Sequence, residues 1–146
     1  MNDGVDDLAK TCFAIAHAEN ISREISSAAS PISLECAVRA ACMLEVSVPK
    51  PGNVHSESDS SGVTHDDFLR SADAVAPVIA GAGLRGVGAT VLDAIRATRR
   101  VVNHNTNLGI VLLLTPLAAV PRDKTLADGI HNVLSNATVE DARDVY

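Results

Sequence analysis

The stretch SPISLECAVRAACMLE, residues 30–45, decides the fold class of this sequence. It opens with Ser30, a good helix N-cap, and with Pro31, which suits the first turn of a helix. A single stripe, within about 40° of Leu34 on a 3.6-residue wheel, then holds Leu34, Val38, Ala41 and Glu45. The spacing predicts an amphipathic helix that begins at Ser30 and carries Glu45 on its buried face.

The composition extends this helical prediction to the whole chain. Its 146 residues are enough for one domain with a hydrophobic core. Hydrophobic residues make up 47% of the chain but aromatic residues only 2%, so the core must consist of small aliphatic side chains. Alanine is the best helix former, whereas sheets favour aromatic and β-branched residues. We therefore predict a single all-α domain, a multi-helix bundle over residues 1–146.

Charge and cysteine content exclude several classes of function. Twelve basic against eighteen acidic residues leave a net charge of −6, which argues against broad binding to nucleic acid or to an anionic membrane. Three cysteines without a C-x-x-C pair indicate neither a disulfide framework nor a zinc cluster. The acidic N-terminus lacks the basic-then-apolar order of a signal peptide. We expect a cytoplasmic protein.

Other segments also show helical periodicity. The most apolar, Leu108 to Val120, has thirteen residues, well short of the roughly 20 needed to span a bilayer, and is predicted to be a buried helix. Thr64 and Asp67 form a capping-box-like start for another helix. The remaining periodic segments lie near residues 5–15, 89–102 and 123–134.

The end of the chain is unusual. Thr138 and Asp141 form a second capping-box-like start, yet the sequence stops at Tyr146, without a C-cap or a partner element. We expect a truncated polypeptide with an incomplete bundle. Its exposed apolar stripes would drive self-association, so we also expect a homo-oligomer.

The loop that follows the first quoted helix is the first candidate site. Lys50 lies between two prolines, and Gly52 permits close approach of a ligand to backbone N–H groups. With Glu45 just before it, this loop suits a phosphate and metal site. A stiff surface loop and a structurally paired Glu45 remain the alternatives.

Two further groups of polar residues stand at predicted helix starts. Asp67 follows His65 in the first turn, where capping explains a carboxylate as well as a Mg²⁺ site does. Asn105, Thr106 and Asn107 precede the apolar helix. There Asn107 serves either as a plain N-cap or as part of a nucleotide site, to which arginines of the preceding helix would add charge.

Taken in order, these motifs resemble the triphosphoribosyl-dephospho-CoA synthase family. The matching segments are Glu45-x-x-x-Pro-Lys-Pro-Gly-Asn-Val54, His65-x-Asp67-Phe68, Ala97-Thr98-Arg99, Asn105-Thr-Asn-Leu-Gly-Ile110 and Leu113-Leu-Thr-Pro-Leu117. The resemblance covers residues 31–146 and leaves 1–30 as an N-terminal helix with a Ser-rich linker. Family members are longer, so the resemblance implies a second helical half, which we expect a truncated chain to be missing.

The resemblance implies transfer of the triphosphoribosyl group of ATP to the 2′-hydroxyl of 3′-dephospho-CoA, with release of adenine. Glu45 and Asp67 would be the catalytic residues and the ligands of Mg²⁺. The substrate-binding and ATP-binding residues would be Lys50, Gly52, Asn53, His65, Arg99, Asn105, Thr106 and Asn107.

The sequence also departs from the family pattern. Pro51-Gly52-Asn53-Val54-His55 stands where better-known members read Pro-Gly-Leu-Val-Asp, and Val63-Thr64-His65 where they read Gly-Ala-His. A divergent transferase with another acceptor is therefore one alternative. The other is a truncated, non-catalytic helical module that binds nucleotide or self-associates.

Overall fold

The computed structural model describes residues 32–47 and 62–146, in which every regular element is a helix. The helices are α2 (Leu34–Ser47), α3 (His65–Ala80), α4 (Ala82–Arg85), α5 (Val87–Val101), α6 (Leu108–Ala118), α7 (Leu126–Ser135) and α8 (Val139–Val145). The predicted all-α fold is confirmed. The helix and linker predicted over 1–30 lie outside the described residues.

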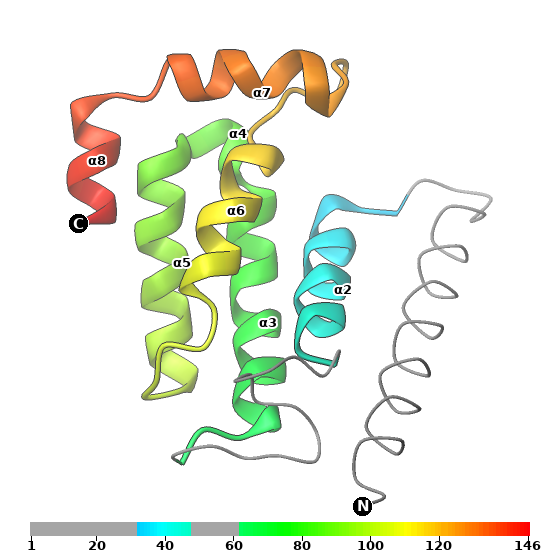
Figure 1. The fold of residues 1–146 in the computed structure, drawn as a ribbon, viewed down its shortest axis with the longest axis vertical. Coiled ribbons are helices and arrows are strands. Elements are labelled where there is room, and N and C mark those ends of the chain that lie inside the picture. Colours follow the sequence, from blue (N-terminus) through cyan, green and yellow to red (C-terminus); the bar gives the residue numbers. More distant parts are fainter. Residues whose placement is uncertain (1–31, 48–61) are drawn as a thin grey trace, which may run out of the picture.

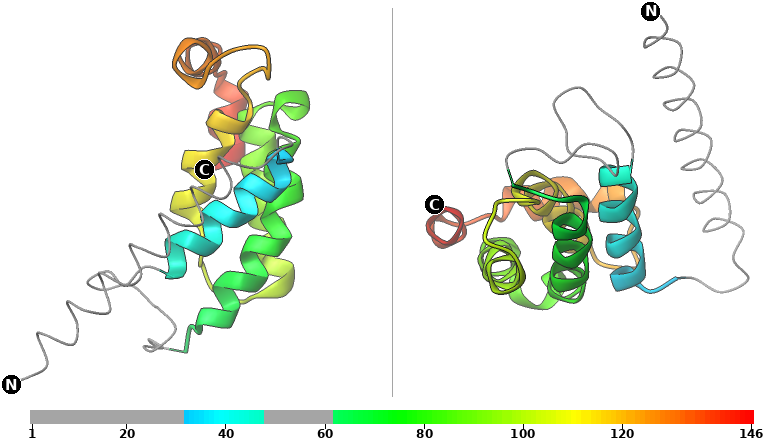
Figure 2. Two further views of the ribbon diagram at one scale, coloured as in Figure 1. Left: turned by 90° about the vertical axis from the view of Figure 1, so that its right-hand side faces the viewer. Right: turned by 90° about the horizontal axis from the view of Figure 1, so that it is seen from below.

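Helices α2, α3, α5 and α6 form the bundle, and they alternate in direction along the chain (Figure 1). Helix α7 lies crosswise over one end of the bundle, and α8 returns alongside α5 (Figure 2). Because of the alternation, the C-terminal ends of α2 and α5 meet the N-terminal ends of α3 and α6 at the opposite end from α7.

The core consists of small side chains, as the composition predicts. Val75, Ala76 and Ile79 of α3 have no exposed surface, and they pack against Val91 of α5 and Val111 of α6. Small side chains let the helix axes approach closely. Helix α3 thus forms the centre of the bundle, with α2 on one side and α5 on the other.

The first bundle helix begins later than the sequence indicates. Ile32 and Ser33 are not helical, and α2 begins at Leu34. The Ser33 hydroxyl accepts the N–H of Cys36 at 3.1 Å, so Ser33 is the N-cap in place of Ser30. Two serines three residues apart offer the same capping chemistry, and the sequence alone does not distinguish them.

The expectation that the last helix lacks a partner is wrong. The Asp141 carboxylate accepts the N–H and the hydroxyl of Thr138, and its second oxygen accepts the N–H of Gly88 at 2.8 Å. A Cβ on Gly88 would overlap the Asp141 backbone, so only glycine allows this contact. Asp141 therefore joins the N-terminus of α8 to the first turn of α5.

The prediction of a buried apolar helix holds for only one face of α6. Helix α6 buries Val111, Thr115 and Ala118, but Leu112 is 40% exposed and Leu113 62% exposed. Leu112 and Leu113 thus lie on a second, outward face. Among the described residues, no helix combines the length and hydropathy needed to cross a membrane.

Candidate functional site

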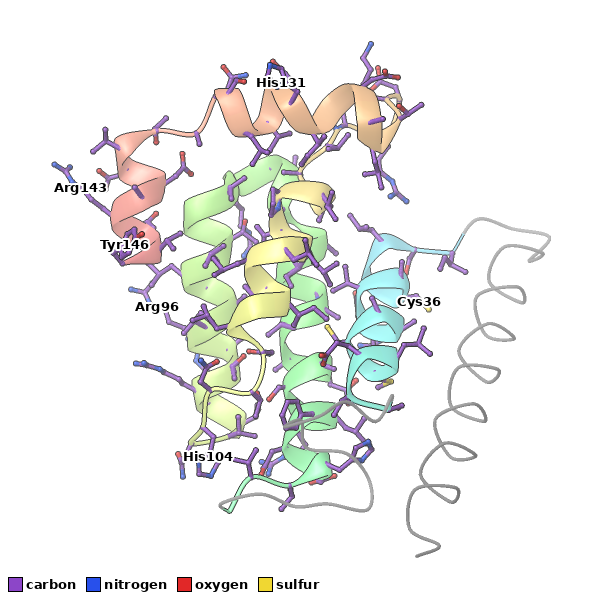
Figure 3. All side chains as sticks on the ribbon, viewed as in Figure 1. Cys36, Arg96, His104, His131, Arg143 and Tyr146 are labelled. Atoms are coloured by element: carbon purple, nitrogen blue, oxygen red, sulfur yellow. The ribbon has the colours of Figure 1, made fainter. Side chains whose placement is uncertain are left out.

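The candidate residues gather at the end of the bundle opposite α7. Glu45 lies near the C-terminal end of α2, and Asn105, Thr106 and Asn107 form the turn before α6. His104, at the start of the same turn, is labelled at this end in Figure 3. The fold therefore brings together motifs that are about sixty residues apart in sequence.

A cavity of about 230 Å³ lies between these two motifs. We call it the α6 pocket, and its lining comprises Glu45, Phe68, Asn105, Thr106, Asn107, Leu108, Gly109 and Ile110. It thus joins the end of α2 to the N-terminus of α6, where backbone N–H groups lack helical partners. Three of the predicted ATP-binding residues and one predicted catalytic carboxylate share this pocket.

Glu45 is half-buried rather than on the fully buried face of α2. That face holds Val38, Cys42 and Val46, spaced four residues apart and each less than 9% exposed. The sequence pattern predicts Glu45 on the same stripe as Val38. In the structure the next residue, Val46, takes the buried position instead. The displacement leaves the carboxylate at the rim of the α6 pocket.

The turn before α6 is held by its own polar side chains. Asn105 Oδ1 accepts the N–H of Leu108 at 3.1 Å, and Thr106 Oγ1 lies 2.6 Å from Ser71 Oγ on α3. Ser71 is fully buried, and its hydroxyl can also donate to the Asp67 carbonyl oxygen, which lies 2.6 Å away. Asn107 occupies the N-cap position of α6, but its side chain makes no capping hydrogen bond, and Asn105 supplies that bond instead.

Asn107 is instead turned into the protein. It is 8% exposed, and its Oδ1 lies 3.1 Å from Thr98 Oγ1 on α5. Its Nδ2 has no hydrogen-bond partner among the described residues. Such a buried amide group is unfavourable without a partner, so this position calls for an explanation.

A second cavity, of about 420 Å³, lies on the other side of the turn. We call it the α5 pocket, and its lining comprises Ile95, Thr98, Arg99, Val102, Asn103, His104, Asn105, Asn107 and Leu108. Arg99 is exposed at its rim. Asn105, Asn107 and Leu108 line both pockets.

Asp67 and His65 lie at the same end of the bundle but line neither pocket. Asp67 forms the predicted capping box with Thr64, whose N–H and hydroxyl both donate to Oδ2 at 3.0 Å. These hydrogen bonds, and to a lesser extent the charge of His104, lower the pKa of Asp67. Its second oxygen is 3.9 Å from Arg70 and faces no closer partner among the described residues.

The donor set can be compared with the needs of Mg²⁺. Within residues 32–47 and 62–146, no three histidine, cysteine or acidic side chains are arranged so that they could together hold a metal ion. Mg²⁺ does not require such a cluster, because one or two carboxylates, water and substrate phosphates suffice. The hard oxygen atoms of Glu45 and of Asp67 Oδ1 are of the right chemical type.

Cysteine chemistry does not contribute at this end of the bundle. Burial, together with the negative charge of Glu45, raises the pKa of the Cys42 thiol to about 11. The thiol is therefore protonated at neutral pH and is a poor nucleophile.

The remaining predicted residues, Lys50, Gly52 and Asn53, lie outside the described residues. The segment that contains them leaves α2 after Ser47 and rejoins the described chain at Gly62, just before α3. Sequence reasoning did not assign Phe68, Ser71, Asn103 or His104 to a site. Their signal was weak, because each is a single residue whose role depends on how the helices pack.

Comparison with known proteins identifies the family. The CitG family, ATP:dephospho-CoA triphosphoribosyl transferase, matches residues 31–146, which is most of the chain. The chain therefore belongs to this family of transferases, and the resemblance drawn from the motifs is confirmed. No curated protein and no solved structure matches it.

Proposed function

We propose that this protein transfers the triphosphoribosyl group of ATP to the 2′-hydroxyl of 3′-dephospho-CoA and releases adenine. The observation that carries the proposal is the α6 pocket, in which Glu45 of α2 meets the Asn105–Asn107 turn. Both motifs fall within residues 31–146, the part that matches the family. Their convergence on one cavity supports the proposal.

The reaction exchanges one bond at the anomeric carbon of the ATP ribose for another. The C1′–N9 bond breaks, and its electron pair leaves with adenine, which takes up one proton. The acceptor 2′-oxygen forms the new C1′–O bond and loses its proton. Positive charge develops on the ribose, so a base near the hydroxyl and charge neutralisation at the triphosphate both lower the barrier.

Glu45 is the residue best placed to accept the hydroxyl proton. Its carboxylate lies at the rim of the α6 pocket, half-buried, where a substrate hydroxyl can reach it. Asp67 is committed through Oδ2 to its capping box, which leaves Oδ1 for a metal ion. Glu45 and Asp67 are the residues that would hold Mg²⁺, which would neutralise charge on the triphosphate.

The N-terminus of α6 suits the triphosphate. The helix has 11 residues, and its first turn, which includes Gly109 and Ile110, lines the α6 pocket. The space around Gly109 is open, since a Cβ there would meet nothing within 4 Å, so a phosphate can approach the backbone closely. Lys50 adds the cation in this proposal.

The proposal is tested by incubating the chain with ATP, Mg²⁺ and 3′-dephospho-CoA. Free adenine is then measured by chromatography and the acceptor product by mass spectrometry. Glu45→Gln keeps the size of the side chain but removes the base, and should reduce the rate by about 10²- to 10⁴-fold. The matched control is Glu140→Gln on α8, an exposed carboxylate far from the pocket, which should leave the rate unchanged.

Two results would contradict the assignment. If the chain binds ATP but releases no adenine with any acceptor tested, it is the non-catalytic nucleotide-binding module. Adenine release that does not depend on dephospho-CoA would point to another acceptor, which the departures at Asn53 and His55 make the second candidate.

A further inference from the structure

We propose that the α5 pocket binds an adenine base, with Asn107 Nδ2 donating a hydrogen bond to the ring nitrogen N1. This inference rests on the proposed function, because it assigns the base of an adenine nucleotide to a cavity next to the α6 pocket. The α6 pocket would then hold the ribose and phosphates. The turn of Asn105 to Leu108 separates the two pockets and would lie beneath the ribose.

The side-chain amide of Asn107 supports this assignment. One end contacts Thr98 Oγ1 at 3.1 Å, while Nδ2 is buried without a partner among the described residues. The residue lines the α5 pocket, so a ligand in that cavity can supply the missing acceptor. Side-chain amides of asparagine pair well with the polar edge of adenine.

The lining of the α5 pocket also suits an adenine ring. Ile95, Val102 and Leu108 offer apolar surface to a flat ring, and the cavity of about 420 Å³ lies within the range of small-molecule sites, roughly 300–1,000 Å³. Arg99 and His104 stand at the exposed rim. A guanidinium or imidazole plane there can stack on a purine.

The geometry also predicts discrimination between purines. Adenine presents an acceptor at N1, whereas guanine carries a hydrogen there and would face the Nδ2 donor with a second donor. We expect the chain to bind ATP at least about tenfold more tightly than GTP, the effect of one mismatched polar contact.

Both substrates of the proposed reaction contain adenine, so the test needs separate arms. Calorimetric titration of the full chain with ATP, GTP, 3′-dephospho-CoA and inorganic tripolyphosphate compares the nucleotides with a base-free polyphosphate. If the pocket takes the base of ATP, replacing Asn107 weakens the binding of ATP and leaves the binding of dephospho-CoA unchanged. Weakened binding of dephospho-CoA alone would contradict the assignment to ATP.

The decisive variant is Asn107→Leu. Leucine has a similar size, and Thr98 keeps a partner because the Ala94 carbonyl also lies 3.1 Å from its hydroxyl. Removing a buried amide that lacks a partner should leave the melting temperature unchanged or raise it. We expect the affinity for the adenine nucleotide to fall at least about tenfold, while tripolyphosphate binds as before. A purely structural asparagine would give the opposite pattern.

A second variant avoids the protein interior. Arg99→Ala removes an exposed side chain at the rim of the pocket, and we expect weaker nucleotide binding without a change in stability. Arg100→Ala is the matched control, because Arg100 is an exposed neighbour on α5 that lines neither pocket. Equal effects of the two substitutions would indicate nonspecific charge attraction and overturn the stacking contact.

Failure of this inference can be distinguished from failure of the proposed function. The adenine assignment is wrong if the wild-type chain binds ATP and GTP equally well, or if the Asn107→Leu variant binds ATP as tightly as the wild type does. In either case the proposed role of the α6 pocket is unaffected. If neither ATP nor dephospho-CoA binds, the proposed function fails, and the adenine assignment fails with it.

Discussion

The carboxylate of Asp141 accepts hydrogen bonds from two helix N-termini. Oδ2 accepts the N–H and the hydroxyl of Thr138 at the start of α8, and Oδ1 accepts the N–H of Gly88 in α5. We expect Asp141→Ala to lower the free energy of unfolding by about 1–2 kcal/mol, the typical effect of losing a helix cap. Urea denaturation followed by circular dichroism measures this, and an unchanged midpoint would contradict the contact.

The same residue predicts a pH dependence. Its hydrogen bonds, first those from the Thr138 side chain and then that from the Gly88 backbone, lower the pKa of Asp141 below 3.8 in the folded state. A lowered pKa means that the charged form stabilises the fold. The difference in stability between wild type and Asp141→Ala should thus be full at pH 7 and shrink as the pH falls below about 3.8. A difference that grows toward acid would have the wrong sign.

Lys50 supplies the prediction that depends on sequence alone. If it faces phosphate, Lys50→Ala should weaken Mg²⁺·ATP binding about ten- to a hundredfold, since a charge-assisted contact is worth roughly 1.5–3 kcal/mol. Arg96→Ala is the control, because Arg96 is exposed on the outer side of α5 and pairs with Asp93 (Figure 3). Equal affinities of wild type and Lys50→Ala would remove the loop from the site.

At the scale of the helices, caps and the period of a buried face could be predicted from the sequence, but contacts between helices could not. The capping boxes at Thr64 and Thr138 were predictable, because each depends on residues three positions apart. The inward set Val91, Thr98 and Val102 was predictable from its period. The side chain of Asn107 was misread, because its contact with Thr98 depends on how α5 meets α6.

The site was predictable only in part, for the same reason. Order along the chain indicated Glu45 and the Asn105–Asn107 turn separately, and their common cavity follows from the alternating directions of α2 and α6. The orphan Nδ2 of Asn107 has no trace in the sequence. An asparagine before an apolar helix looks like a cap whether or not it acts as one.

The α5–α8 contact yields a prediction for one helix. In Gly88→Ala the added methyl group would overlap the Asp141 backbone, so α8 must shift or detach. We expect faster amide hydrogen exchange in α8 and a loss of stability, although alanine is the better helix former. Gly83→Ala is the control, because the nearest atom, the Ala119 carbonyl oxygen, lies at an ordinary 3.9 Å. Equal protection of α8 in both variants would contradict the close contact.

At the scale of the molecule, the outward face of α6 bears on self-association. Leu112 and Leu113 are 40% and 62% exposed, and contiguous apolar surface of this kind favours contact between proteins. We expect a dimer or larger species in sedimentation velocity at micromolar concentration. Leu113→Gln should shift the distribution toward monomer without loss of helix content. A wild-type chain that stays monomeric would contradict this expectation.

The central claim is that Mg²⁺·ATP binds at the end of the bundle where α2 meets the N-terminus of α6. Titration of the ¹⁵N-labelled chain, followed by amide chemical shifts, tests it most directly. If Mg²⁺·ATP binds there, the amide signals of Glu45 and of residues 106–110 shift together and saturate at the same nucleotide concentration. Shifts confined to the groove between α2, α6 and α7, around Leu34, Leu117 and Lys124, would contradict it.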